Sequence, residues 1–329
     1  MADRIQGLGT DFPASDPISA TLTQDTWIRN LRSNTRRRYL DIQNEDTTND
    51  LRFQFVNNPF ALSFDGGDHV DVDTILGAGS PILTSPRGSI EANLRNPSAF
   101  TQRNTIFSLG DTNANEYLRL YIDNADKKLK AELRTAAAVQ WALETDLAID
   151  NFGIDFTKFF YTVKILQAFN VDDNAGANPE PKLFVNGGSP TQTFTTSTDK
   201  TKWVPDIQAN VDNARIGSLN INSAGEADQF EGLIDFLVVK HEDDFKHLID
   251  VARYNIDEGS GTTLADRSGN GFNGTFGGGA AAPTWVVRSN GRVISRDTGR
   301  DFVDNESPQT AVWLFTAAAA HGTVTLREG

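Results

Sequence analysis

Apolar and polar residues alternate along short segments of this chain, as they do along half-buried β-strands. Between Leu51 and Phe55, apolar residues alternate with Arg52 and Gln54. Clusters of Asn, Asp and Gly, which favour turns, separate many further segments of this kind. The segments predicted to form strands are 26–31, 37–43, 51–56, 61–72, 88–94, 104–109, 117–122, 128–135, 159–166, 182–185, 214–216 and 230–239. Many short strands at this spacing predict an all-β fold built from antiparallel sandwiches.

One segment has the period of a helix instead. Within 242–254, the apolar residues Phe245, Leu248, Ile249 and Ala252 would share one helical face. Three consecutive acidic residues at the start of the segment would lie at the positive end of the helix dipole. The pattern therefore predicts a helix over 242–254.

The segment 254–286 reads YNIDEGSGTTLADRSGNGFNGTFGGGAAAPTWV. It resembles the opening of a laminin-G/concanavalin-A-like domain, which normally leads directly into a strand such as ALSFDGGDHVDV. Here that strand occupies 61–72, far upstream of the segment. YLRLYIDNADKKLKAELR, PKLFVNG and FEGLIDFLVV resemble later strands of the same family, with Phe236 in place of an expected acid. The resemblance implies a jelly roll that is circularly permuted, as domains with neighbouring termini tolerate.

Both ends of the chain resemble a second family. The segments 17–55 and 307–329 are similar to the small β-sandwich proteins of tailed-phage virions. This resemblance implies that a discontinuous phage-type sandwich carries the laminin-G-like domain as an insert. The expected organisation is an N-terminal arm at 1–16, an anchor domain at 17–58 and 287–329, and the permuted domain at 59–286. A length of 329 residues also favours two domains.

Composition narrows the partners of the chain. A formal net charge of −14 argues against nucleic-acid and membrane-surface partners, because nucleic acids and anionic membrane surfaces would both repel the chain. The absence of cysteine excludes disulfides and cysteine chemistry. The first residues lack the apolar region of a signal peptide, so we expect synthesis in the host cytoplasm. Arg36, Arg37 and Arg38 form a basic cluster that is either a solvated face or a docking surface for an acidic capsid partner.

Two kinds of ligand site are suggested by residue type. Aromatic side chains can stack on the apolar face of a sugar ring, and the candidates are Tyr117, Trp141, Phe169 and Trp203, with core packing as the alternative. Carboxylates in the glycine-rich turns suit calcium, and the candidates are Asp65, Asp68 and Asp266. Calcium is the one cofactor considered, and plain turn formation is its alternative.

Catalytic patterns are weak. Some concanavalin-A-like proteins are glycan hydrolases with paired carboxylates on one strand, and the nearest match is Glu144, Asp146 and Asp150. The pattern departs at its last residue, and the four histidines have no ligand spacing. We therefore expect no catalytic residues and no enzyme activity.

The resemblances imply a structural protein of a phage virion. The expected role is a capsid decoration or head-fibre-like protein, an oligomer on the particle, that displays a lectin-like domain for cell-surface glycan. A receptor-binding or adaptor protein of the tail is the alternative, and a glycan hydrolase is the third. These resemblances specify the fold better than the ligand.

Overall fold

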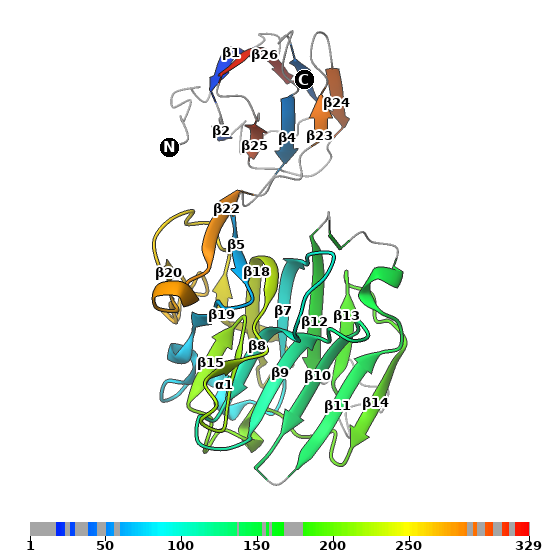
Figure 1. Cartoon of the computed structure of the whole chain (residues 1–329), viewed down its shortest axis with the longest axis vertical. Coiled ribbons are helices and arrows are strands. Elements are labelled where there is room, and N and C mark those ends of the chain that lie inside the picture. Colours follow the sequence, from blue (N-terminus) through cyan, green and yellow to red (C-terminus); the bar gives the residue numbers. More distant parts are fainter. Residues whose placement is uncertain are drawn as a thin grey trace. The chain divides into compact units, whose positions relative to one another are not determined.

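The computed structural model describes residues 60–287, except 137, 153–155, 158–159 and 168–179, and the backbone of eight strands outside that range. Contacts divide the chain into two compact units (Figure 1). The terminal unit comprises 1–59 and 288–329, and the central unit comprises 60–287.

The terminal unit combines strands from both ends of the chain. The sheet β1-β26-β3-β24 and the sheet β2-β25-β4-β23 each alternate N-terminal and C-terminal strands. Val312 is the register partner of Phe55, and Leu326 is the partner of Ile42. The predicted pairing of the two ends is thus confirmed. The strands are β1 (Ile18–Thr23), β2 (Trp27–Arg29), β3 (Tyr39–Asn44), β4 (Leu51–Phe55), β23 (Arg292–Ile294), β24 (Arg300–Asp304), β25 (Ala311–Phe315) and β26 (Ala320–Glu328).

The central unit is a sandwich of two antiparallel sheets, as the all-β prediction requires. The front sheet contains, in spatial order, β14 (Gln192–Ser197), β11 (Val139–Thr145), β10 (Leu129–Arg134), β9 (Tyr117–Ile122), β8 (Asn104–Gly110), β15 (Asn213–Ile216), β6 (Val70–Asp71), β21 (Gly274–Phe276) and β20 (Thr263–Leu264). The back sheet contains β13 (Lys182–Val185), β12 (Tyr161–Gln167), β7 (Gly88–Arg95), β18 (Glu231–Glu242), β5 (Phe60–Asp65) and β22 (Thr284–Val287), and β19 (Leu248–Tyr254) also pairs with β18.

Smaller elements lie in the connections. They are the strand pair β16 (Leu219–Asn220) and β17 (Glu226–Ala227), the helix α1 (Pro81–Thr84), and the 3₁₀ turns η1 (Asp73–Leu76), η2 (Ile149–Phe152), η3 (Val204–Asp206) and η4 (Gly279–Ala281). Among the described residues, no helix has the length and apolar character that crossing a bilayer requires.

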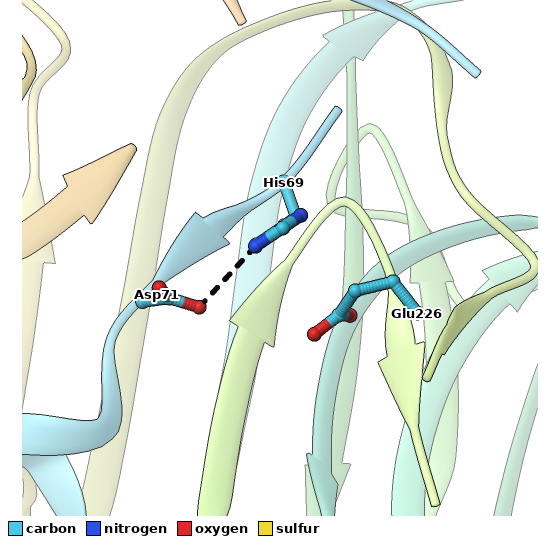
Figure 2. A group of neighbouring side chains, drawn as sticks. All are labelled: His69, Asp71 and Glu226. Carbon is cyan, nitrogen blue, oxygen red and sulfur yellow. Dashed lines mark ion pairs between the residues drawn. The ribbon is translucent and has the colours of Figure 1, made fainter. Parts of the chain in front are cut away.

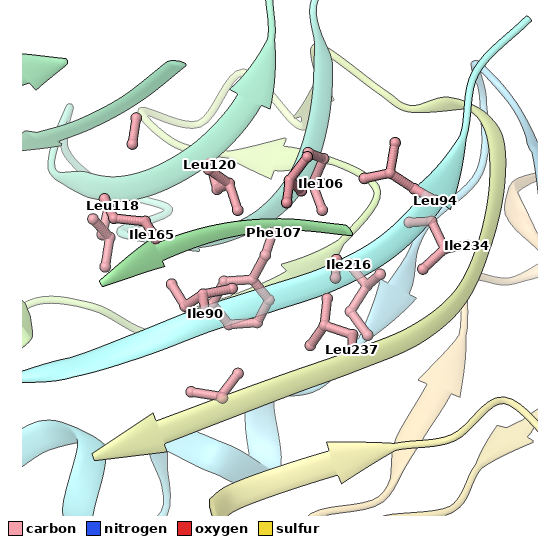
Figure 3. Close-up of a cluster of buried hydrophobic side chains, with 14 of the residues drawn as sticks. Ile90, Leu94, Ile106, Phe107, Leu118, Leu120, Ile165, Ile216, Ile234 and Leu237 are labelled. Carbon is pink, nitrogen blue, oxygen red and sulfur yellow. The ribbon is translucent and has the colours of Figure 1, made fainter. Parts of the chain in front are cut away.

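The hydrophobic core lies between the two sheets. In β10, Leu129, Ala131 and Leu133 are buried while the charged residues between them lie on the other face, as a period of two dictates. Figure 3 shows the meeting of apolar side chains from both sheets. Those of the back sheet include Ile90, Leu94, Ile165, Ile234 and Leu237, and those of the front sheet include Ile106, Phe107, Leu118, Leu120 and Ile216.

The displaced segment 254–286 returns to the strand that it would precede in the usual order. In β22, Trp285 is the register partner of Leu62 in β5, and in β21, Phe276 is the partner of Val70 in β6. The segment therefore packs against the strand that begins at Ala61, as a circularly permuted order implies. At the end of the same ladder, Val287 is the partner of Phe60. The chain therefore enters and leaves the central unit at neighbouring positions.

The predicted helix over 242–254 is wrong. The segment contains the end of β18, a tight turn and β19, which pairs with β18 from Leu248 to Tyr254. The carboxylate of Asp243 accepts the backbone N–H groups of Phe245 (2.9 Å) and His247 (2.7 Å). Lys246 has a positive φ of 66°. A side chain that closes the turn on its own backbone and a long partner strand override the helical spacing of the apolar residues.

Candidate functional site

A groove of about 350 Å³ opens at one end of the back sheet, where β5 and β7 end and β18 begins. Because β18 is antiparallel to both β5 and β7, its first residues lie beside their last residues. Asp65, Arg95, Glu231 and Leu233 line the groove from these three strand ends. Its volume is at the lower end of the roughly 300–1,000 Å³ that is usual for ligand pockets. The groove thus suits a small ligand or one unit of a larger one.

Gly232 allows the start of β18 to lie very close to the end of β7 at this groove. Its φ is +139°, and a Cβ at this position would lie 2.5 Å from the carbonyl oxygen of Arg95. A side chain therefore cannot be accommodated where β18 meets the end of β7. Just beyond, the register between these strands shifts at a bulge between Ile234 and Phe236. Bulges of this kind often adjoin functional sites.

The amide of Asn96 also lines the groove. Asn96 is 2% exposed, and its Oδ1 accepts a hydrogen bond from the hydroxyl of Tyr161. Its Nδ2 is buried and has no hydrogen-bond partner among the described residues. An unsatisfied buried donor costs about 1–3 kcal/mol, and its occurrence beside the groove makes Asn96 a candidate contact for a ligand hydroxyl.

The remaining polar groups of the groove provide both acceptors and a donor. Asp65 is exposed, and its Oδ1 accepts the backbone N–H of Gly67 at 2.9 Å. One carboxylate oxygen of Glu231 accepts the backbone N–H and the hydroxyl of Thr101, both at 2.8 Å. The guanidinium carbon of Arg95 lies 5.7 Å from the ring centroid of Phe160. Two carboxylates against one guanidinium give the groove an excess of negative charge.

Two of the predicted sugar-stacking residues belong to the core. Trp141 in β11 is fully buried, and Trp203 is 2% exposed. Their rings stack with centroids 6.2 Å apart, and the indole N–H of Trp141 donates to the carbonyl of Lys202 at 2.8 Å. The prediction that these two side chains reach a sugar is therefore wrong. The core-packing alternative applies to both.

Tyr117 is likewise buried, within a polar network on the outer face of the front sheet. Its hydroxyl donates to Glu132, and burial raises the pKa of Tyr117 well above its usual range. The guanidinium of Arg119 lies 3.1 Å from Glu132 and 2.8 Å from Asp228, and it lies over the ring of Tyr121. Tyr117 therefore supports the sheet and does not offer an open stacking surface. Phe169 lies outside the described residues.

The predicted calcium aspartates serve as turn acceptors. Asp68 accepts the backbone N–H of Asp65 at 2.8 Å. Asp266 accepts three backbone N–H groups, those of Arg253, Ser268 and Phe272, at 2.8–3.0 Å. Asp65, Asp68 and Asp266 are not brought together within ligand distance of one another among the described residues. The plain turn-forming alternative explains the contacts of Asp68 and Asp266.

The three acids considered for hydrolysis do not share a strand face. Glu144 lies in β11, which ends at Thr145, and Asp150 lies in η2. The carboxylate of Glu144 lies 2.6 Å from Nζ of Lys128 and 3.1 Å from Nζ of Lys130. Asp146 accepts the hydroxyl of Thr193 at 2.7 Å. The strand assumed to carry all three acids ends too early for that arrangement.

One group of side chains is suited to hold a metal. Donor atoms of His69, Asp71 and Glu226 lie within 4.8 Å of one another, and this is the one such group among the described residues (Figure 2). Asp71 is in β6, His69 lies two residues before it, and Glu226 comes from β17. Nε of Arg215 lies 2.9 Å from an oxygen of Asp71 and 2.9 Å from one of Glu226.

Sequence reasoning missed both the groove and the histidine group. The spacing of His69 and Asp71 places two potential ligands on one face of a strand, which is a weak signal. Glu226, Asn96 and Arg95 come from distant segments, and no local pattern connects them to these sites. Arg36, Arg37 and Arg38 lie outside the described residues.

No family model matches the chain, and no curated protein matches it. Among solved structures, the chain is similar to the CBM40 of the Ruminococcus gnavus IT-sialidase bound to α2,3-sialyllactose, with 20% identity over 54% of this chain and 88% of that chain and a TM-score of 0.41. It is also similar to leech intramolecular trans-sialidase, with 19% identity over 60% of this chain and 27% of that chain and a TM-score of 0.41. A third is tailspike protein 2 of Escherichia coli O157:H7 bacteriophage CAB120, with 12% identity, coverages of 69% and 27%, and a TM-score of 0.32. These likenesses assign no ligand to this chain.

Proposed function

We propose that the central unit is a lectin-like module that binds a neutral sugar in the groove at the end of the back sheet. The observation that carries this proposal is the buried Nδ2 of Asn96, which has no partner among the described residues. Asp65, Glu231 and Arg95 add the mixture of acceptors and donors that sugar hydroxyls need, and Leu233 offers an apolar surface to the ring.

The charge of the groove favours a neutral sugar over an acidic one. Its carboxylates outnumber its guanidinium group, and the whole chain carries a formal net charge of −14. A sialylated or sulfated glycan would be repelled by both. The proposed ligand class is therefore the neutral part of a cell-surface polysaccharide.

The proposed setting is a tailed-phage virion. The resemblance of both chain ends to virion proteins supports this proposal, as does a terminal unit that is assembled from those two ends. In this proposal the terminal unit anchors several copies of the chain on the capsid, as a decoration or head-fibre-like protein. An adaptor or receptor-binding protein of the tail is the alternative location. We propose binding without catalysis, because two lysines already pair with Glu144.

Substitution of polar residues in the groove tests the proposed sugar site. Asp65→Asn and Asn96→Asp are each expected to weaken binding of a neutral oligosaccharide at least tenfold, because each changes the hydrogen-bonding character of one groove group. The measurement is a titration of the full chain with the oligosaccharide that it binds best on an array of neutral and sialylated glycans. Asp65 is exposed, so its variant should fold normally.

Glu91→Gln is the matched control for the groove variants. Glu91 lies in β7, the strand that ends at the groove, but it pairs with Lys164 at 3.0 Å and does not line the groove. The Glu91→Gln variant should bind the oligosaccharide as tightly as the unaltered chain does. Unchanged binding by both groove variants, or preferential binding of sialylated glycans, would contradict the proposed site.

The anchor is tested on virus particles. Replacing Arg36, Arg37 and Arg38 with serine is expected to lower the occupancy of the protein on the particles, because it removes the charges that would attract an acidic capsid partner. Salt should lower the occupancy of the unaltered protein in the same way, because surface ion pairs are individually weak and are screened by salt. Immuno-electron microscopy with an antibody against the central unit reports both occupancy and location. Normal occupancy of the triple variant at low and high salt would rule out the arginine anchor.

A further inference from the structure

We propose that His69, Asp71 and Glu226 form a binding site for a first-row divalent transition metal, with Zn²⁺ as the best-suited ion. One imidazole and two carboxylates are ligands that zinc accepts, whereas calcium prefers oxygen ligands alone. Three protein ligands leave at least one coordination position open to solvent or to another ligand. This site shares no residue with the groove, so it stands independently of the proposed sugar binding.

The geometry of the three donors is close to that of a metal site. Nε2 of His69 lies 3.5 Å from Oδ1 of Asp71. Two ligand atoms of a tetrahedral zinc ion, each about 2.1 Å from the metal, lie about 3.4 Å apart. All three donor atoms lie within 4.8 Å of one another, so a small movement of Glu226 would complete the set.

The imidazole of His69 is held in place, and its Nδ1 makes no hydrogen bond among the described residues. The backbone N–H of His69 donates to Ala281 at 3.1 Å, and the N–H of Gly277 donates to the carbonyl of His69 at 2.9 Å. A Cβ at Gly277 would lie 2.7 Å from Cε1 of the imidazole, so the ring packs closely over this glycine. Nδ1 is buried with no hydrogen-bond partner among the described residues.

The net negative charge around the three donor atoms favours the binding of a cation. Three carboxylates, those of Asp71, Asp73 and Glu226, pair with the single guanidinium of Arg215. The carboxylates therefore carry two more negative charges than Arg215 neutralises. A divalent ion would balance this excess, while Arg215 alone cannot.

The site is tested with Zn²⁺ and Co²⁺ on the full chain. We expect saturable zinc binding by calorimetry with about one ion per chain, a higher Tm in zinc, and visible absorption bands on adding Co²⁺, which report coordination directly. His69→Gln and Glu226→Gln should each lower zinc affinity at least tenfold and remove the Co²⁺ bands. Because the metal-free variants can be checked by circular dichroism, loss of folding is separable from loss of the site.

His247→Gln is the matched control, because His247 also pairs with an aspartate, Asp243, at 3.5 Å but is 72% exposed. It should keep zinc binding and the Co²⁺ spectrum. The proposal is overturned if the unaltered chain binds no zinc saturably, if His69→Gln binds it as tightly, or if His247→Gln is the variant that loses it.

Discussion

Replacing Trp141 with alanine is expected to lower the free energy of unfolding of the central unit by about 3–5 kcal/mol, the usual cost of truncating a buried Trp. Trp141 is fully buried, stacks on Trp203, and donates its indole N–H to Lys202. The variant would leave a cavity and a carbonyl without its donor. Calorimetry of the full chain should show the transition of the central unit at a lower temperature.

Phe245→Ala is the control for this prediction. Phe245 is 79% exposed in the turn between β18 and β19, so its loss should change the free energy of unfolding by less than about 0.5 kcal/mol. If Trp141→Ala instead kept full stability and lost sugar binding, Trp141 would be a stacking residue after all.

Replacing Asp266 with alanine is expected to cost about 2–3 kcal/mol, because the carboxylate accepts three backbone N–H groups and the hydroxyl of Ser268. These contacts fix the turn that carries the displaced segment. Asp257→Ala removes the same charge from the same region but only an exposed ion pair with Arg267, so it should cost less than about 0.5 kcal/mol. Equal effects of the two variants in urea denaturation would show that the turn does not depend on Asp266.

The effect of Asp266 should depend on pH. Burial alone would raise the pKa of Asp266, but the hydrogen bonds from Arg253, Ser268 and Phe272 lower it below its usual value. In the unfolded chain, an aspartate carboxyl has a pKa near 3.9. The Asp266 carboxylate therefore stabilises the fold fully above that pH, and this stabilisation is lost as the pH falls through the lower pKa of the folded state. The difference between the unaltered chain and Asp266→Ala should therefore shrink below about pH 4. A constant difference from pH 7 to pH 2.5 would contradict this assignment.

Strand periodicity predicted most of the central unit because burial on one face repeats every two residues. The segments around β7, β8, β9 and β10 were found in this way. The same reasoning failed at 242–254, where apolar residues spaced like a helix flank a turn that Asp243 closes. It also gave no strand at β11, although Gln140 and Glu144 alternate there with the buried Trp141 and Leu143.

The candidate sites were harder to predict than the strands. Aromatic residues are equally suited to a core and to a sugar site, and only the stacking of Trp141 on Trp203 decides between these roles. The groove depends on the absence of a side chain at Gly232 and on three strand ends that are distant in sequence. Such a site arises from packing, which no single segment encodes.

The pairing of Val287 with Phe60 has a consequence for the order of folding. Joining β4 to β25 within the terminal unit requires closing the chain between 60 and 287, which as a flexible loop would cost about 5 kcal/mol in entropy. Once the central unit has folded, the same two ends are held as adjacent strand residues, and that entropy has already been lost. The central unit should therefore fold early and act as a template, and refolding kinetics should show the terminal unit forming only after it.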